Sequence, residues 1–132
     1  MNDEKTQMVD LLEAKVKGSA VINKFSRSGF LIGKKLYKNS IFITSEKVEL
    51  WKLQSDHVTL KDFNFLKKVK PTPELLIIGV GVSLEDPFFK LRSLMSSLNI
   101  PVDIMTTSAA CRTWNVLLSE GRNLFACIKL PN

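Results

Sequence analysis

The sequence has few of the side chains that most often carry chemistry. Among 132 residues there are two cysteines, Cys111 and Cys127, and one histidine, His57. Cys and His alone therefore cannot complete a four-ligand zinc site. We expect reduced cysteines that pack as small hydrophobic residues, as in cytosolic proteins, although their spacing also permits a disulfide. His57 has no Ser or Cys partner close by, and we interpret it as a loop or capping residue.

Long apolar runs are also missing. The longest nearly apolar run, residues 75–84, contains two glycines and falls well short of the ~20 residues that cross a bilayer. The opening Met-Asn-Asp-Glu-Lys has neither the apolar core of a secretory signal nor the Arg-rich character of a mitochondrial presequence. We therefore expect a cytoplasmic chain, with peripheral contact with a membrane as an alternative.

What is present is an ordinary globular composition with an uneven charge. Hydrophobic residues make up 45% and charged residues 24%, and the length suits a single core. The net charge is +6, and it comes from residues 15–70, which carry thirteen Lys and Arg against four acids. A solvated basic face is the preferred interpretation and a protein or lipid surface the second. No nucleic-acid partner is expected, because no nucleic-acid motif accompanies the charge.

Hydrophobic periodicity divides the chain into an arm and one domain. Residues 1–19 are predicted to form an N-terminal arm or helix that Gly18 ends, and residues 20–132 a single α/β domain. Alternation with period two, broken by turn residues, predicts an antiparallel β-meander at the start of this domain. Its expected strands are 20–22, 29–32, 40–44 and 47–53, with turns at 26–29, 33–35 and 45–47.

Beyond residue 58 the pattern alternates between helix and strand. Thr59 and Asp62 form a capping-box pattern that opens a short helix, and Pro71 and Pro73 prevent its continuation. Strand-helix-strand units then predict a three-layer α/β domain with a mixed central sheet flanked by helices, to which the meander is added. The expected strands are 74–80, 102–105 and 124–130, and the expected helices are 59–69, one from Asp86-Pro87 to Asn99, and one from Thr106-Thr-Ser108 to Gly121.

The candidate ligand residues lie where parallel strands are expected to end. Gly79 and Gly81 follow a strand, but Leu84 replaces the third glycine of a dinucleotide-binding motif and acids follow it. We interpret these glycines as a tight exit from the strand. Thr106 and Thr107 stand at a helix start, where anions often bind and where Thr also serves as a plain cap. Capping is preferred, and an anion site remains the alternative.

Charged residues near both ends of the last helix form a second group. Glu120 can pair with Arg112 or Arg122 and hold the helix to its neighbouring strand. We prefer this role to catalysis because no general base, nucleophile or metal ligand stands beside them. No catalytic residue, metal or cofactor is predicted. The candidate ligand or interaction residues are Gly79, Gly81, Thr106, Thr107, Arg112, Glu120 and Arg122.

Two segments carry a family resemblance. Leu75-Leu-Ile-Ile-Gly-Val-Gly81 and Met105-Thr-Thr-Ser-Ala-Ala-Cys-Arg-Thr-Trp-Asn-Val-Leu-Leu-Ser-Glu-Gly-Arg122, with the apolar tail that follows, resemble the family of mitochondrial complex I assembly factor three. Its bacterial and archaeal relatives are often described as proteins of unknown function (DUF498). The resemblance runs from about Ile22 to the C-terminus. Val80 stands where the family usually has Thr, so no polar role is carried over to it.

The resemblance implies a three-layer α/β fold with a mixed sheet and no established catalytic activity. In mitochondria it implies binding to other proteins while the respiratory NADH dehydrogenase is assembled at the inner membrane. We therefore expect a non-enzymatic interaction module, from a bacterium by its Lys, Asn and Ile content, with complex I subunits or another assembly factor as partners. The alternative is a small-ligand or anion-binding, weakly catalytic domain with its pocket at the carboxyl ends of the parallel strands.

Overall fold

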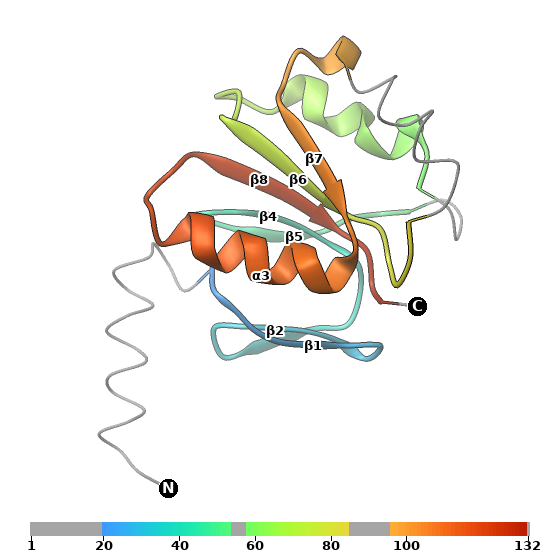
Figure 1. Ribbon diagram of the computed structural model, residues 1–132, viewed down its shortest axis with the longest axis vertical. Helices are drawn as coiled ribbons and strands as arrows, with labels where there is room; N and C mark the ends of the chain where they lie inside the picture. Colours follow the sequence, from blue (N-terminus) through green and yellow to red (C-terminus); the bar gives the residue numbers. More distant parts are fainter. Residues whose placement is uncertain (1–19, 54–57, 85–95, 132) are drawn as a thin grey trace, which may run out of the picture.

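The computed structural model describes residues 20–53, 58–84 and 96–131, and its strands form two sheets (Figure 1). The small sheet is an antiparallel meander of β1 (Ile22–Ser26), β2 (Gly29–Ile32) and β3 (Lys35–Tyr37). The main sheet has five strands in the order β5-β4-β8-β6-β7. Its strands are β4 (Ile41–Thr44), β5 (Val48–Leu50), β6 (Leu75–Gly79), β7 (Val102–Met105) and β8 (Leu124–Ile128).

The main sheet is mixed, as predicted. β6 runs parallel to both of its neighbours, β7 and β8, whereas β4 runs antiparallel to β8 and to β5. The middle of β6 is buried on both faces: Ile77 belongs to one core and Leu76 and Ile78 to the other. This double burial explains why β6 reads as a continuous apolar run rather than as an alternating strand.

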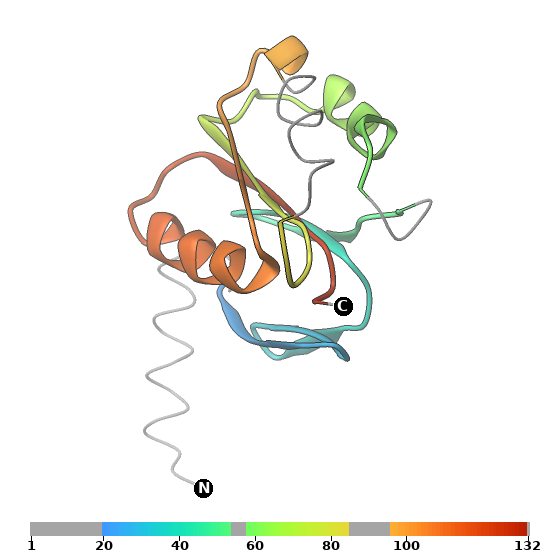
Figure 2. The same ribbon diagram turned by 45° about the vertical axis from the view of Figure 1, so that its right-hand side comes forward.

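Three layers result from the way the two faces of the main sheet are covered. Helix α3 (Thr107–Leu118) and the small sheet lie on one face, where Trp114 and Phe30 join the same core. The 3₁₀ helix η1 (Leu60–Lys68) lies on the other face, where Phe63 and Leu66 belong to the same core as Phe125 of β8. Figure 2 shows the same arrangement from a second side. The predicted three-layer α/β fold is therefore confirmed.

The meander differs from the prediction in several respects. Its first strand, expected at 20–22, is β1 at Ile22–Ser26, where the chain pairs with β2. Residues 35–37, part of which was expected as a turn, form β3, because Gly33 takes a positive φ of 60° and reverses the chain in a short turn. In addition, β4 and β5 do not continue the meander; they join the main sheet through the pairing of β4 with β8. β5 ends at Leu50, earlier than the predicted residue 53.

The helix expected at 59–69 is η1, and its sequence explains why it is a 3₁₀ helix. Its apolar residues Leu60, Phe63 and Leu66 recur every three residues, which matches the three residues per turn of this helix type. Asp62 accepts a hydrogen bond from the Thr59 backbone N–H at 2.8 Å, as the capping-box pattern predicts. The end of β5 is tied to η1 by Trp51, whose Nε1 donates to the Asp62 carbonyl at 2.8 Å.

The last helix agrees with its sequence signals at both ends. The Thr106 hydroxyl accepts from the Ala109 N–H at 3.3 Å, and Gly121 takes a positive φ of 73° after the final turn. Asn99, at a φ of 58°, follows the short helix η2 (Ser96–Leu98) as predicted. The arm at 1–19, His57 and most of the helix expected from Asp86 lie outside the described residues.

Candidate functional site

The junction of β6 with α3 is tightly packed around Gly79. A Cβ added at this position would lie 2.9 Å from the Ala110 Cβ, 3.1 Å from the Ile128 Cγ2 and 3.2 Å from the Thr107 Cα. Only a residue without a side chain lets the helix approach the strand this closely. Gly81, two residues later, takes a φ of 104° and turns the chain away from the strand.

We expect Gly79→Ala to lower the free energy of unfolding by about 1–3 kcal/mol, because the new methyl group overpacks this junction. Urea denaturation of the wild type, Gly79→Ala, Ala110→Gly and the double variant would measure it. Ala110→Gly removes the nearest contact, so the double variant should recover part of the loss even though glycine disfavours a helix. Strictly additive losses would contradict the packing explanation.

Thr107 is fully buried and its polar groups bind other parts of the main chain. Its hydroxyl donates to the Lys129 carbonyl at 2.6 Å and accepts from the Gly81 N–H at 2.9 Å. The Thr107 backbone N–H donates to the Gly81 carbonyl at 2.8 Å. These bonds join the ends of β6, β8 and α3, so the hydroxyl is used within the fold rather than directed at solvent.

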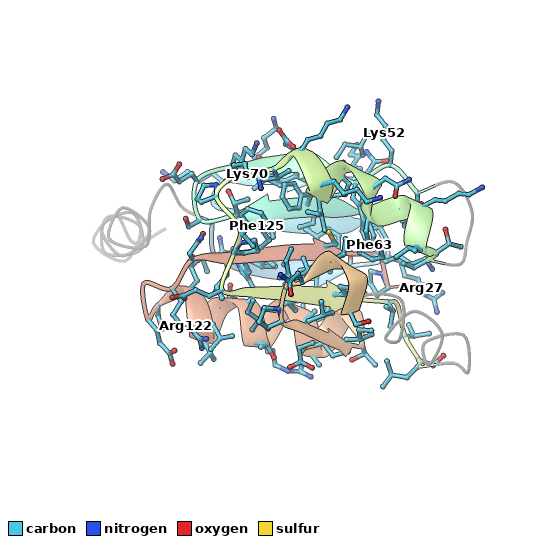
Figure 3. The ribbon with its side chains drawn as sticks, turned by 90° about the horizontal axis from the view of Figure 1, so that it is seen from above. Arg27, Lys52, Phe63, Lys70, Arg122 and Phe125 are labelled. Carbon is cyan, nitrogen blue, oxygen red and sulfur yellow. The ribbon has the colours of Figure 1, made fainter. Side chains whose placement is uncertain are left out.

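The charged candidates lie elsewhere. Arg122, beyond the C-terminal end of α3, contacts Glu74 (Nε to Oε2, 3.6 Å) and Glu120 (Nη1 to Oε1, 3.9 Å). All three side chains are about half exposed, so these ion pairs add little to stability. A helix of this length spans about 18 Å, which separates the Arg122 group from Thr107. Figure 3 shows Arg122 at the α3 side of the molecule. Arg112 is exposed on α3.

Six of the seven candidate residues therefore form two groups and not one site, and the seventh, Arg112, lies on α3 outside both groups. Gly79, Gly81, Thr106 and Thr107 meet at the start of α3, as their positions at strand ends and a helix N-terminus predicted. The ion pair of Glu120 with Arg122 occurs as expected, and the additional partner, Glu74, ties the end of α3 to the start of β6.

The two cysteines lie in different cores on opposite faces of the main sheet. Cys111 lies on the buried side of α3, Cys127 of β8 lies on the η1 side of the sheet, and both are free thiols. Burial raises the pKa of the Cys111 thiol to about 12, against a small lowering by Arg112. Burial, with a contribution from Asp62, also raises the pKa of Cys127. Both thiols are protonated at neutral pH and are poor nucleophiles. Because they lie on opposite faces of the main sheet, the two cysteines do not form a disulfide with each other.

Sequence reasoning missed the contacts by which α3 holds β1. The Asn115 side chain accepts from the Ile22 N–H at 2.9 Å and donates to the Ile22 carbonyl at 2.8 Å, as a neighbouring strand would. Trp114 donates from Nε1 to the Ala20 carbonyl at 2.9 Å. The adjacent Trp114 and Asn115 gave the sequence signal for these contacts. It did not identify their partners, which lie more than ninety residues earlier.

Two concavities of about 300 Å³ occur on the part of the chain that the structure describes, and lysines line both. One lies beside η1 and is lined by Leu66, Ile100, Lys67 and Lys70 among others. The other lies between the small sheet and the β4–β5 turn, beside Lys34 and Lys47. Neither of the two includes Thr106 or Thr107. No group of three His, Cys, Asp or Glu side chains suited to a metal ion occurs in the part of the chain that the structure describes.

Several known proteins are similar to this chain over most of its length. A 13 kDa major membrane protein of Francisella tularensis subsp. holarctica is 24% identical over 92% of this chain and 98% of that protein. The mouse NADH dehydrogenase [ubiquinone] 1 alpha subcomplex assembly factor 3 is 26% identical over 93% of this chain and 67% of its own length. The crystal structure of an outer membrane protein from Bartonella henselae superposes with a TM-score of 0.69 at 29% identity. The superposition covers 84% of this chain and 94% of the Bartonella chain.

The fold places the chain among three-layer α/β proteins with a mixed central sheet. Within this class, the family model described as "Protein of unknown function (DUF498/DUF598)" matches residues 22–128. The chain belongs to this family. The matched range agrees with the start near Ile22 that the sequence resemblance indicated. Among the described residues, no helix has the length and apolar character needed to span a membrane.

Proposed function

We propose that this chain is a non-enzymatic protein-interaction module that takes part in the assembly of a respiratory NADH dehydrogenase. The similarity to the mouse assembly factor, over 93% of this chain, supports the proposal. The non-enzymatic part of the proposal rests on the hydrogen bonds of the Thr107 hydroxyl. In open α/β sheets, ligands bind beyond the carboxyl ends of the strands, and here the buried hydroxyl at that place binds Gly81 and Lys129.

The proposal includes peripheral contact with a membrane. Two similar proteins are named as membrane proteins, one from Francisella and one from Bartonella. The described residues contain no helix that could span a bilayer, so in this proposal the contact is made by the surface of the domain. The partners we propose are subunits of the dehydrogenase or a second assembly factor that binds them.

The experiment is deletion of the gene in the organism that encodes the chain. We expect assembled dehydrogenase, measured by native gel electrophoresis and by NADH oxidation in isolated membranes, to fall several-fold, and a plasmid copy to restore it. A tagged chain should recover dehydrogenase subunits or an assembly protein after cross-linking. Normal levels of the assembled enzyme in the deletion strain, together with no recovered subunit, would refute the proposal.

A further inference from the structure

The outer face of the small sheet carries two leucines, of which Leu36 is exposed and Leu31 is partly exposed. Leu31 lies between the buried residues Phe30 and Ile32, so strand alternation directs it away from the core. The strand register places Leu36 of β3 directly beside it, and Leu36 is 48% exposed. On the other side of Leu31 the register places Lys24 of β1. One row across all three strands therefore reads Lys, Leu, Leu on the outward face.

Leu31 has no neighbouring side chain on the outward face of its own strand. The positions two residues before and after it are Gly29 and Gly33. Gly29 cannot easily change, because an added Cβ would lie 2.3 Å from the Tyr37 carbonyl oxygen. On the β2 side, the leucine pair therefore has no larger side chain beside it and forms a small apolar centre.

Cations surround this centre. Lys38 immediately follows β3, Arg27 lies in the β1–β2 turn, and Lys24 lies in the row itself, all of them exposed. No acidic residue occurs between positions 20 and 45. We call this surface the leucine–lysine face: Lys24, Arg27, Leu31, Leu36 and Lys38. Lys34 is not part of it, because it lines the concavity between the small sheet and the β4–β5 turn. It faces away from the main sheet and lies on the opposite side of that sheet from η1 (Figures 1 and 2).

We infer that the leucine–lysine face binds the surface of an anionic bilayer. Two leucines give too small an apolar centre for a stable protein interface, which buries about 1,200–2,000 Å² and is poor in lysine at its core. A bilayer surface suits this composition, because lysines gain from anionic headgroups while leucines enter the boundary of the acyl region. The inference deepens the proposed function and rests on it for the membrane setting, whereas the geometry stands independently.

The test is sedimentation of the purified full-length chain with vesicles at low salt. We expect binding to vesicles of phosphatidylcholine mixed with phosphatidylglycerol and not to phosphatidylcholine alone. Lys24→Gln/Lys38→Gln should weaken binding about 25-fold, since each lysine near the surface contributes about fivefold. Leu36→Ser should weaken it several-fold.

The matched control is Lys61→Gln/Lys67→Gln, which removes the same charge from exposed positions of η1. It should change binding about twofold at most, because these lysines face away from the membrane and are screened. Circular dichroism of each variant checks that it is folded.

Three outcomes would overturn the inference. Equal losses in the two double variants would mean that net charge alone is responsible, and a wild-type chain that binds no vesicle would mean that the face is only solvated. Absence of vesicle binding, combined with loss of dehydrogenase subunits from Lys24→Gln/Lys38→Gln in the pull-down, would mean that the face docks an acidic protein. The vesicle assay contains no dehydrogenase, so its failure removes the direct bilayer contact but leaves the proposed role in dehydrogenase assembly standing. A normal deletion strain leaves the vesicle result standing.

Discussion

Trp114→Ala is expected to lower the free energy of unfolding by about 3–5 kcal/mol. Trp114 is 0% exposed and is the largest fully buried side chain among the described residues. It occupies the core that α3, the small sheet and the main sheet share, so its removal leaves a cavity at the junction of three elements. The Ala20 carbonyl also loses the N–H donor that lies 2.9 Å away. Urea or guanidinium denaturation followed by circular dichroism measures the loss.

Two controls separate packing from hydrogen bonding at this position. Trp114→Phe keeps most of the buried ring but removes the N–H, and should cost about 1–2 kcal/mol. Val116→Ala, two residues further along α3 and 61% exposed in the parent, should stay within about 0.5 kcal/mol. A loss below about 1 kcal/mol for Trp114→Ala would show that the helix is not anchored through this side chain.

The parallel half of the fold was readable from the sequence because its signals are local. The strand at 102–105 was predicted with the bounds that β7 has. The caps of α3 were predicted from Thr106 and Gly121, each of which acts within one helical turn. β6 was recognised because a strand buried on both faces has no polar position to interrupt it.

The division of strands between two sheets was not readable, because it depends on pairing between distant residues. β4 belongs to the main sheet through its pairing with β8, more than eighty residues later. The alternation of apolar residues within β4 predicts a strand but does not identify the strand with which it pairs. β3 was missed because Lys-Leu-Tyr is short and polar enough to read as part of a turn. With β3 missed, the pairing of Leu31 with Leu36 could not be predicted either.

In the candidate site, too, local contacts could be predicted from the sequence, whereas hydrogen bonds between distant residues could not. The meeting of Gly79, Gly81, Thr106 and Thr107 could be predicted, because strand ends and helix starts adjoin in strand-helix-strand units. Whether the Thr107 hydroxyl turns inward or outward could not, since its acceptor is the carbonyl of Lys129, which follows β8. The ion pair of Glu120 with Arg122 was local and therefore predictable, while the contact with Glu74 was not.

Thr107→Val is expected to lower the free energy of unfolding by about 2–4 kcal/mol although it barely changes the shape of the side chain. The substitution removes the donor to the Lys129 carbonyl and the acceptor for the Gly81 N–H at one stroke. Each buried polar group left without a partner costs about 1–3 kcal/mol. Chemical denaturation of the variant measures the loss.

Thr107→Ser is the matched control, because it keeps the hydroxyl and removes only a methyl group; it should cost about 1 kcal/mol. Thr106→Val, which removes the helix cap at the exposed side of the same turn, should also cost about 1 kcal/mol. A larger loss for Thr107→Val than for either control would mean that the buried hydroxyl holds the ends of β6, β8 and α3 together. If Thr107→Val unfolds like the wild type, the hydroxyl contributes no net stability inside the fold. The anion-binding alternative for this helix start would then become the better account of why a threonine is present.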